Sequence, residues 1–212
     1  MKKTTVFLLI SAFAFVSAKA DVLLSQDFEG LTGLSDNGWT VVVDDRAEAD
    51  CWKLTSKSSA ISGEASATAG GFHNLPATEQ CLVSPDVTLG EDDYKLQFLW
   101  GGASAAYAIE RQEYDFQVRV QVVGEDSWTR VFSFTNQADV EASGVKWPWV
   151  NWNTYQSTVD VSAFAGKTIR VAFVWLKFND GYSGNTVKFD DITLESYVKP
   201  TGAIIESATS SY

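Results

Sequence analysis

The sequence predicts an all-β protein that folds as an antiparallel sandwich or barrel, and three observations support this. Apolar residues alternate with polar ones along several segments, as in strands with one buried face. Clusters of turn-forming residues, such as those at 124–126 and 179–181, separate these segments. After the first twenty residues no segment sustains helical periodicity, and 103–109 comes nearest. Strands that follow one another without intervening helices pair in antiparallel sheets.

The expected strands follow from the alternation, taken in chain order. Short strands are expected at 22–28, 39–43, 80–83, 127–134 and 155–161. The clearest strands lie at 94–100, 116–122 and 169–175, where apolar residues, most of them aromatic or β-branched, occupy every second position. Two intervening stretches, 56–71 and 138–153, have the composition of loops.

The last expected strand, 187–194, breaks its own alternation. Val187 and Phe189 share one phase, whereas Ile192 and Leu194 belong to the other. The pattern therefore slips by one residue between Phe189 and Ile192. A slip of this kind is typical of a β-bulge, which redirects the side chains that it carries.

Two adjacent acids, Asp190 and Asp191, occupy the expected bulge, and Lys188 is the only basic residue beside them. Two carboxylates held close together need a compensating positive charge. A hard cation, above all Ca²⁺, would supply it. The alternative is that both acids are solvated on the surface.

The first twenty residues have the features of an export signal. Lys2 and Lys3 precede an apolar run at 6–16, and small residues, Ala18 and Ala20, flank a cleavage point before Asp21. The run is too short to span a bilayer, which needs about twenty residues. We therefore expect an exported chain with a single β-sandwich domain at 21–197, a polar tail at 198–212, and no membrane-spanning segment.

The composition limits the partners of the protein. Removing the signal takes three lysines from a chain of formal net charge −11, which leaves −14. This excess of acids excludes nucleic acid as an expected partner, because phosphate binding needs Lys and Arg. Cations and neutral sugars remain open. Zinc and redox metals are not expected, because the chain has one His and two Cys.

The two cysteines, Cys51 and Cys81, lie in the exported part of the chain. An oxidising compartment would allow them to form a disulfide. The alternative is two buried thiols, because free cysteine is among the most buried residue types.

A tryptophan-rich stretch near position 150 is the candidate ligand platform. Aromatic rings contact the C–H groups of sugars, and neighbouring amides bond to their hydroxyls. The candidate ligand-binding residues are Trp147, Trp149, Asn151 and Trp152. The alternative is that these tryptophans close one end of the sandwich. A further set of tryptophans falls inside strand patterns and is assigned to packing: Trp39, Trp100, Trp128 and Trp175.

Several motifs together resemble a known family. They are QDFEG at 26–30 with Gly38-Trp39, CLVSP at 81–85, VDVSAFAGKT at 159–168 and FDDI at 189–192. On these residues the chain resembles the MAM-like jelly-roll modules of bacterial surface proteins known as the cleaved-adhesin or choice-of-anchor J family. The resemblance covers nearly the whole chain after residue 20.

The resemblance implies a two-sheet β-sandwich, or jelly roll, in which the first and last strands lie side by side. It also implies a structural Ca²⁺ held between these strands, with Asp27 and Glu29 near Asp190 and Asp191. An acidic stretch at 44–50 lies between two tryptophans, as in the family. Arg46 and Ala47 interrupt it, however, which argues against a second ion site.

The function that these features favour is a non-catalytic binding or adhesion module for a glycan or a surface protein. One rival is a polysaccharide hydrolase or lyase that uses two of Glu110, Glu113 and Asp115 as its paired carboxylates. Another is a structural subunit of a surface assembly. His73, the only histidine, lies far from any serine in a nucleophile-elbow setting.

Overall fold

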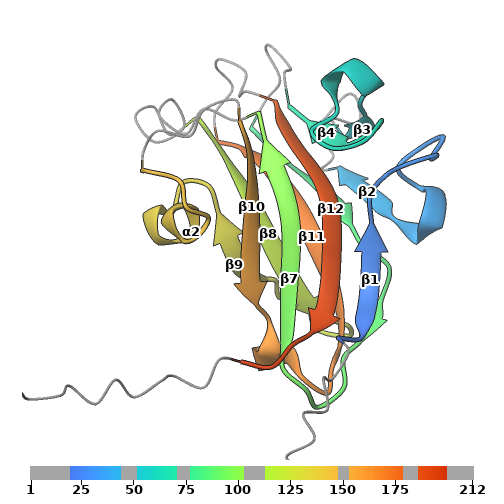
Figure 1. The fold of residues 1–212 in the computed structure, drawn as a ribbon, viewed down its shortest axis with the longest axis vertical. Coiled ribbons are helices and arrows are strands. Elements are labelled where there is room, and N and C mark those ends of the chain that lie inside the picture. The colour runs from blue at the N-terminus through green and yellow to red at the C-terminus, as the bar shows by residue number, and fades with distance from the viewer. Residues whose placement is uncertain are drawn as a thin grey trace, which may run out of the picture.

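The computed structural model describes residues 20–43, 52–70, 77–102, 113–147, 153–178 and 186–199. Within these residues two antiparallel six-stranded sheets face each other across a shared core (Figure 1). The predicted two-sheet β-sandwich is confirmed. The first described strand begins at Val22 and the last ends at Ser196.

One sheet has the strand order β10-β7-β12-β4-β3, and β1 also pairs with β12. Because β1 pairs with 192–195 of the last strand and β4 pairs with 187–189, these two short strands share one edge of β12. The bounds are β1 Val22–Gln26, β3 Lys53–Leu54, β4 Ala67–Ala69, β7 Tyr94–Gly101, β10 Thr154–Asp160 and β12 Val187–Ser196.

The other sheet has the order β2-β5-β11-β8-β9, and β6 also pairs with β11. The central strand β11 is buried along most of its length because it lies between β5 and β8. The bounds are β2 Thr40–Val43, β5 Thr78–Val83, β6 Val87–Thr88, β8 Tyr114–Val122, β9 Thr129–Ser133 and β11 Thr168–Lys177.

The centre of the core is a cluster of aromatic rings contributed by both sheets. Phe189 of β12 lies with its ring centroid 4.1 Å from that of Phe116 and 4.8 Å from that of Phe173. Each fully buried ring of this size contributes about 1.5–3 kcal/mol to stability. Three of the tryptophans assigned to packing are buried as predicted: Trp39, Trp100 and Trp175. Trp128 is partly buried against a second, smaller apolar cluster.

The two predicted loops contain regular structure, so these predictions were partly wrong. The stretch 56–71 holds the 3-10 helix η2, Lys57–Ser59, and strand β4. The stretch 138–153 holds most of helix α2, Gln137–Ala142. Asn136 caps this helix, because its side chain accepts a hydrogen bond from the Asp139 amide. Such short elements lack the length over which periodicity is readable. Strands β3 and β6, two residues each, were missed for the same reason.

The first and last strands are neighbours, as the resemblance implies, and β12 carries the predicted bulge. Gln26 pairs with Ile192, so the end of β1 lies beside the middle of β12. The register of β12 against β7 shifts between Asp190 and Thr193. Asp191 at this shift has a φ of 45°, a conformation that non-glycine residues seldom adopt.

None of the helices in the described ranges is long and apolar enough to cross a bilayer.

Candidate cation site at the bulge of the last strand

The bulge sends its two acids to different environments. Asp190 is 0% exposed, whereas Asp191 is exposed. The Asp190 carboxylate accepts a 2.6 Å hydrogen bond from the Ser66 hydroxyl and a 2.9 Å bond from the Asp191 amide. Both donors are neutral. A buried carboxylate is therefore held by two dipoles rather than by an opposite charge.

This environment shifts the titration of Asp190. Burial raises its pKa to about 6, above the ordinary value of 3.8. The hydrogen bonds from Ser66 and from the Asp191 amide oppose the shift, and the negative charges of Asp191 and Glu29 add to it. Lys188 does not relieve the site, because its ammonium donates to the Ser59 carbonyl at 2.6 Å. The charge balance of this region is therefore incomplete.

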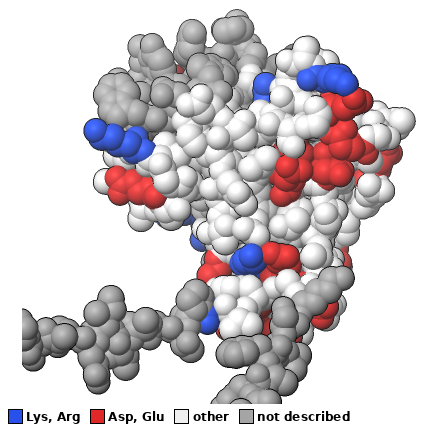
Figure 2. Space-filling model, viewed as in Figure 1, with Lys and Arg blue, Asp and Glu red and all other residues white. Residues whose placement is uncertain are grey.

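The segment 62–66 gathers the acids that the sequence placed far apart. Ser62 donates to Asp191 at 2.9 Å. Glu29 accepts hydrogen bonds from the Glu64 amide at 2.6 Å and from the Ala65 amide at 3.2 Å. Asp and Glu side chains collect on this side of β12, next to β1 and β4 (Figure 2). The segment thus ties β12 to the chain that follows β1.

The backbone of this segment fits closely around Glu29. Gly63 has a φ of +53°, and a Cβ atom built there would lie 2.0 Å from the Glu29 Oε1 atom. Glycine permits both this backbone conformation and the close approach without displacing the Glu29 carboxylate. Gly63 therefore allows the segment to wrap around the carboxylate.

Three of the four predicted metal ligands converge on this segment: Glu29, Asp190 and Asp191. The fourth, Asp27, is exposed and accepts a 3.1 Å bond from the Glu29 amide. Sequence reasoning missed Ser62 and Ser66, because they lie in a stretch interpreted as a loop. The run of small residues at 65–69 was the available signal, since small side chains pack where backbones approach closely.

The carboxylates of the site suit Ca²⁺, which prefers carboxylate and carbonyl oxygens and water. A cation would also supply the positive charge that the Asp190 carboxylate lacks among its neighbours. The arrangement is not a finished ligand set, however: the part of the chain that the structure describes has no group of three or more His, Cys, Asp or Glu placed to hold a metal ion. Ca²⁺ binding would require Glu29 or Asp191 to turn toward Asp190.

The candidate ligand platform falls mostly outside the described residues. Trp147 is partly buried and packs against the core. Trp149, Asn151 and Trp152 lie outside the described ranges, as do the candidate acid Glu110 and His73. The platform therefore stays a prediction.

Asp115, a second candidate acid, is buried and held by its neighbours. Its carboxylate accepts from the Ser133 hydroxyl and from the Gln117 side chain, the latter at 2.6 Å. Burial raises the pKa of Asp115, and these hydrogen bonds oppose the rise. A carboxylate enclosed in this way is poorly placed to reach a polysaccharide.

Cys81 is a free thiol in the structure, 3.8 Å from the Glu79 carboxylate, while Cys51 lies outside the described residues. Burial first, and then the negative charge of Glu79, raise the pKa of Cys81 to about 12. The predicted disulfide is not seen and stays a prediction.

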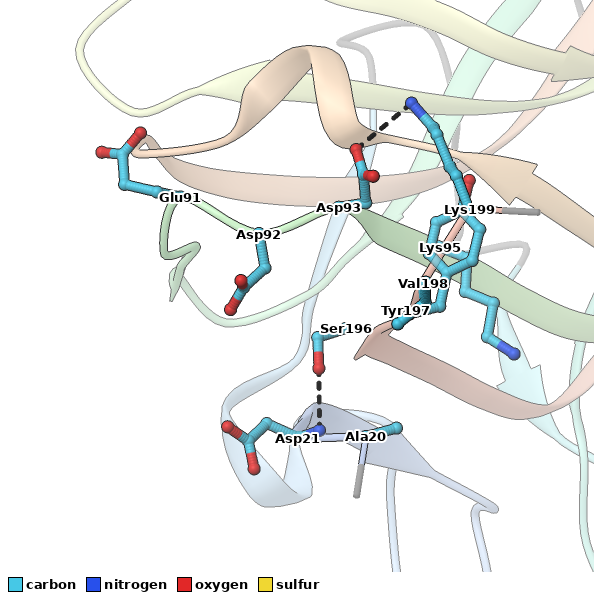
Figure 3. Close-up of a pocket in the computed structure, with 10 residues that line it drawn as sticks. All are labelled: Ala20, Asp21, Glu91, Asp92, Asp93, Lys95, Ser196, Tyr197, Val198 and Lys199. Carbon is cyan, nitrogen blue, oxygen red and sulfur yellow. Dashed lines mark hydrogen bonds and ion pairs between the residues drawn. The ribbon is translucent and has the colours of Figure 1, made fainter. Parts of the chain in front are cut away.

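A groove lies at the end of the sandwich away from β3 and β4, and an ion pair and a hydrogen bond join residues that line it (Figure 3). Lys199 lies 3.3 Å from Asp93 and 3.0 Å from Asp160, and the Asp21 amide donates to the Ser196 hydroxyl at 2.9 Å. Burial would raise the pKa of Asp160, but hydrogen bonds from Ser162 and Lys199 lower it to about 2. These contacts link the residue before β1 and the segment after β12 to this end of the sandwich.

Comparison with solved structures identifies the fold. The K1 cleaved adhesin domain of Lys-gingipain from Porphyromonas gingivalis W83 superposes with a TM-score of 0.55 at 18% identity, over 85% of this chain and 99% of that domain. The K3 cleaved adhesin domain of the same protein gives 0.54 at 18% identity, over 83% and 100%. The chain has the cleaved-adhesin jelly-roll fold.

A further solved structure, TmCBM61 in complex with β-1,4-galactotriose, superposes less well, with a TM-score of 0.45 at 16% identity over 82% of this chain and 100% of that one. No protein-family model and no curated protein matches the sequence. The resemblance to cleaved-adhesin domains is thus confirmed as a likeness of fold.

Proposed function

We propose that the chain is an exported, non-catalytic binding module that recognises a glycan or a surface protein and carries a structural Ca²⁺. The fold supports the binding role, because the solved structures similar to it include adhesin domains. The signal-like first twenty residues support export. The enclosure of Asp115 speaks against the rival hydrolase mechanism at that residue.

The observation that carries the calcium proposal is Asp190. Asp190 is 0% exposed, and within the described residues its carboxylate accepts hydrogen bonds from neutral donors only and has Glu29 and Asp191 as its charged neighbours. Isolated buried charges are costly unless paired or bound to a metal. In this proposal Asp190 holds the ion with Glu29 and Asp191, and Ca²⁺ fixes segment 62–66 against β12.

A glycan and cell-surface array tests the binding role. We expect the wild-type protein to bind at least one glycan or surface protein, and Trp149→Ala to reduce that binding. Phe178→Ala is the matched control, because Phe178 is also aromatic and is 50% exposed. Absence of binding to every array member, together with reducing-sugar release that Glu113→Gln abolishes, would replace the proposal with an enzymatic one.

A further inference from the structure

A groove of about 680 Å³ opens at one side of the sandwich. It lies between β2, the end strand of one sheet, and β3, the end strand of the other. The segment 32–35, which follows β1, forms its third wall. The groove is separate from the bulge of β12, and none of the residues discussed so far as ligands lines it.

Two tryptophans line this groove, and their indole N–H groups differ. Trp39 and Trp52 are each 3% exposed. The Trp52 indole donates to the Gln80 carbonyl at 3.1 Å, so it is satisfied within the fold. No hydrogen bond joins the Trp39 indole to any residue in the described ranges. The Trp39 indole nitrogen is not among the described side-chain atoms that are fully enclosed without a partner, so its N–H keeps access to solvent.

The rest of the groove combines polar groups with apolar surface. Thr40 and Lys53, both exposed, line it together with the apolar residues Leu34, Val41 and Leu54. Two of the lining side chains can only donate hydrogen bonds: Trp39 through its indole N–H and Lys53 through its ammonium. A ligand here also meets apolar contacts within the same small volume.

The wall formed by segment 32–35 is held in place before any ligand arrives. The Asp36 carboxylate accepts bonds from the Thr32 amide at 2.7 Å, the Thr32 hydroxyl at 3.0 Å and the Gly33 amide at 3.2 Å. Leu34 inserts into the core and is 6% exposed. A preformed wall lowers the entropy lost on binding.

We infer that this groove binds one pyranose residue of a glycan, with the Trp39 indole and the Lys53 ammonium donating to its hydroxyl oxygens and Leu54 contacting its C–H face. The inference rests on the proposed glycan-binding function and assigns a surface to it. A pyranose supplies hydrogen-bond acceptors and apolar C–H groups within a few ångströms of each other. An extended peptide fits less well, because β2 offers an edge of only four residues.

The test follows the indole N–H signals of ¹⁵N-labelled protein by NMR during titration with β-1,4-galactotriose, xylohexaose and mannohexaose. We expect at least one saccharide to shift the Trp39 indole signal while the Trp52 signal stays in place. Trp39→Phe assigns the signal and should weaken binding about 3- to 10-fold, the value of one hydrogen bond. Thr40→Val tests whether the exposed lining of the groove contributes to saccharide affinity, because Thr40 lies outside the core. Thr154→Val in edge strand β10 is its matched control, because Thr154 is also an exposed strand threonine.

The outcomes separate this inference from the proposed function. Saccharide binding that leaves the Trp39 signal and the Thr40→Val affinity unchanged would overturn the groove and keep the glycan-binding role. No shift of any indole with any of the three saccharides would overturn the sugar site in the groove and leave the surface-protein role of the proposed function standing. Shifts of the β2 amides with the peptide Ac-TVVV-NH₂, but not with saccharides, would reassign the groove to strand addition and overturn the sugar site.

Discussion

The hydroxyl of Ser66 lies 2.6 Å from the Oδ2 atom of Asp190, and this hydrogen bond joins residues that are 124 positions apart in the chain. Ser66 and Asp190 are both 0% exposed. The bond fastens the chain before β4 to the bulge of β12, at the point where the candidate cation site is built.

Ser66→Ala should lower the free energy of unfolding by about 1.5–3 kcal/mol, because it removes a hydrogen bond to a buried charged acceptor. Urea unfolding measures this. Ser62→Ala is the control, since its bond to Asp191 is exposed, and a loss of less than about 1 kcal/mol is expected. Equal losses of unfolding free energy in the two variants would show that burial of Asp190 does not strengthen its hydrogen bond with Ser66.

Gly63→Ala should destabilise the protein more than Gly124→Ala. Both glycines have positive φ, +53° and +95°, so both variants incur backbone strain of about 1 kcal/mol. Only at Gly63 would the new Cβ also clash, at 2.0 Å from Glu29 Oε1, whereas Gly124 has nothing within 4 Å. Thermal unfolding compares the variants. The added Glu29→Ala change should recover part of the loss at Gly63; no recovery would mean that segment 62–66 does not enclose Glu29.

Cys81 should react slowly with a disulfide reagent in the folded protein at pH 8, because burial raises the pKa of its thiol to about 12. Reaction should become fast in denaturant. Fast labelling of the folded protein would contradict the burial of Cys81. Absence of any thiol in denaturant would instead show that Cys81 is paired, as the sequence alone suggested.

The pH dependence of stability without divalent ions should carry the signature of Asp190. Its folded-state pKa of about 6 lies above the ordinary 3.8, so the folded state favours the protonated form. The stability from this group is present in full below pH 3.8 and is lost as the pH rises through 6. The loss is about 3 kcal/mol at most. Asp190→Asn removes this component. Identical pH profiles for Asp190→Asn and wild type in chelator would refute the assignment.

The strands that the sequence predicted are those in which alternation extends over five or more positions. In β7, β8 and β11 one face lies against the core throughout, so burial enforces the period of two. The bulge was also predictable, because Phe189 and Ile192 are both fully buried and must therefore change phase between them. Alternation of apolar and polar residues therefore predicts a strand wherever one face of that strand is buried in the core.

The segment around Ser62 and Ser66 was not predictable in this way. Its side chains are small and its contacts are bonds to Glu29, Asp190 and Asp191, none of which leaves a periodic pattern. The same holds for the groove beside Trp39, whose walls come from β2, β3 and segment 32–35 and meet only when both sheets are formed. Sequence alone placed the acids but could not show which backbone surrounds them.

We propose that a divalent cation balances the negative charge of Glu29, Asp190 and Asp191. The direct measurement is the melting temperature at pH 7.5 in excess chelator and then with Ca²⁺ added, for wild type and Asp190→Asn. At a Ca²⁺ concentration 100 times the dissociation constant, wild type should gain about 2.7 kcal/mol, roughly 5–10 °C for a chain of this size, and Asp190→Asn should gain little. Identical melting curves with and without Ca²⁺ would contradict the claim.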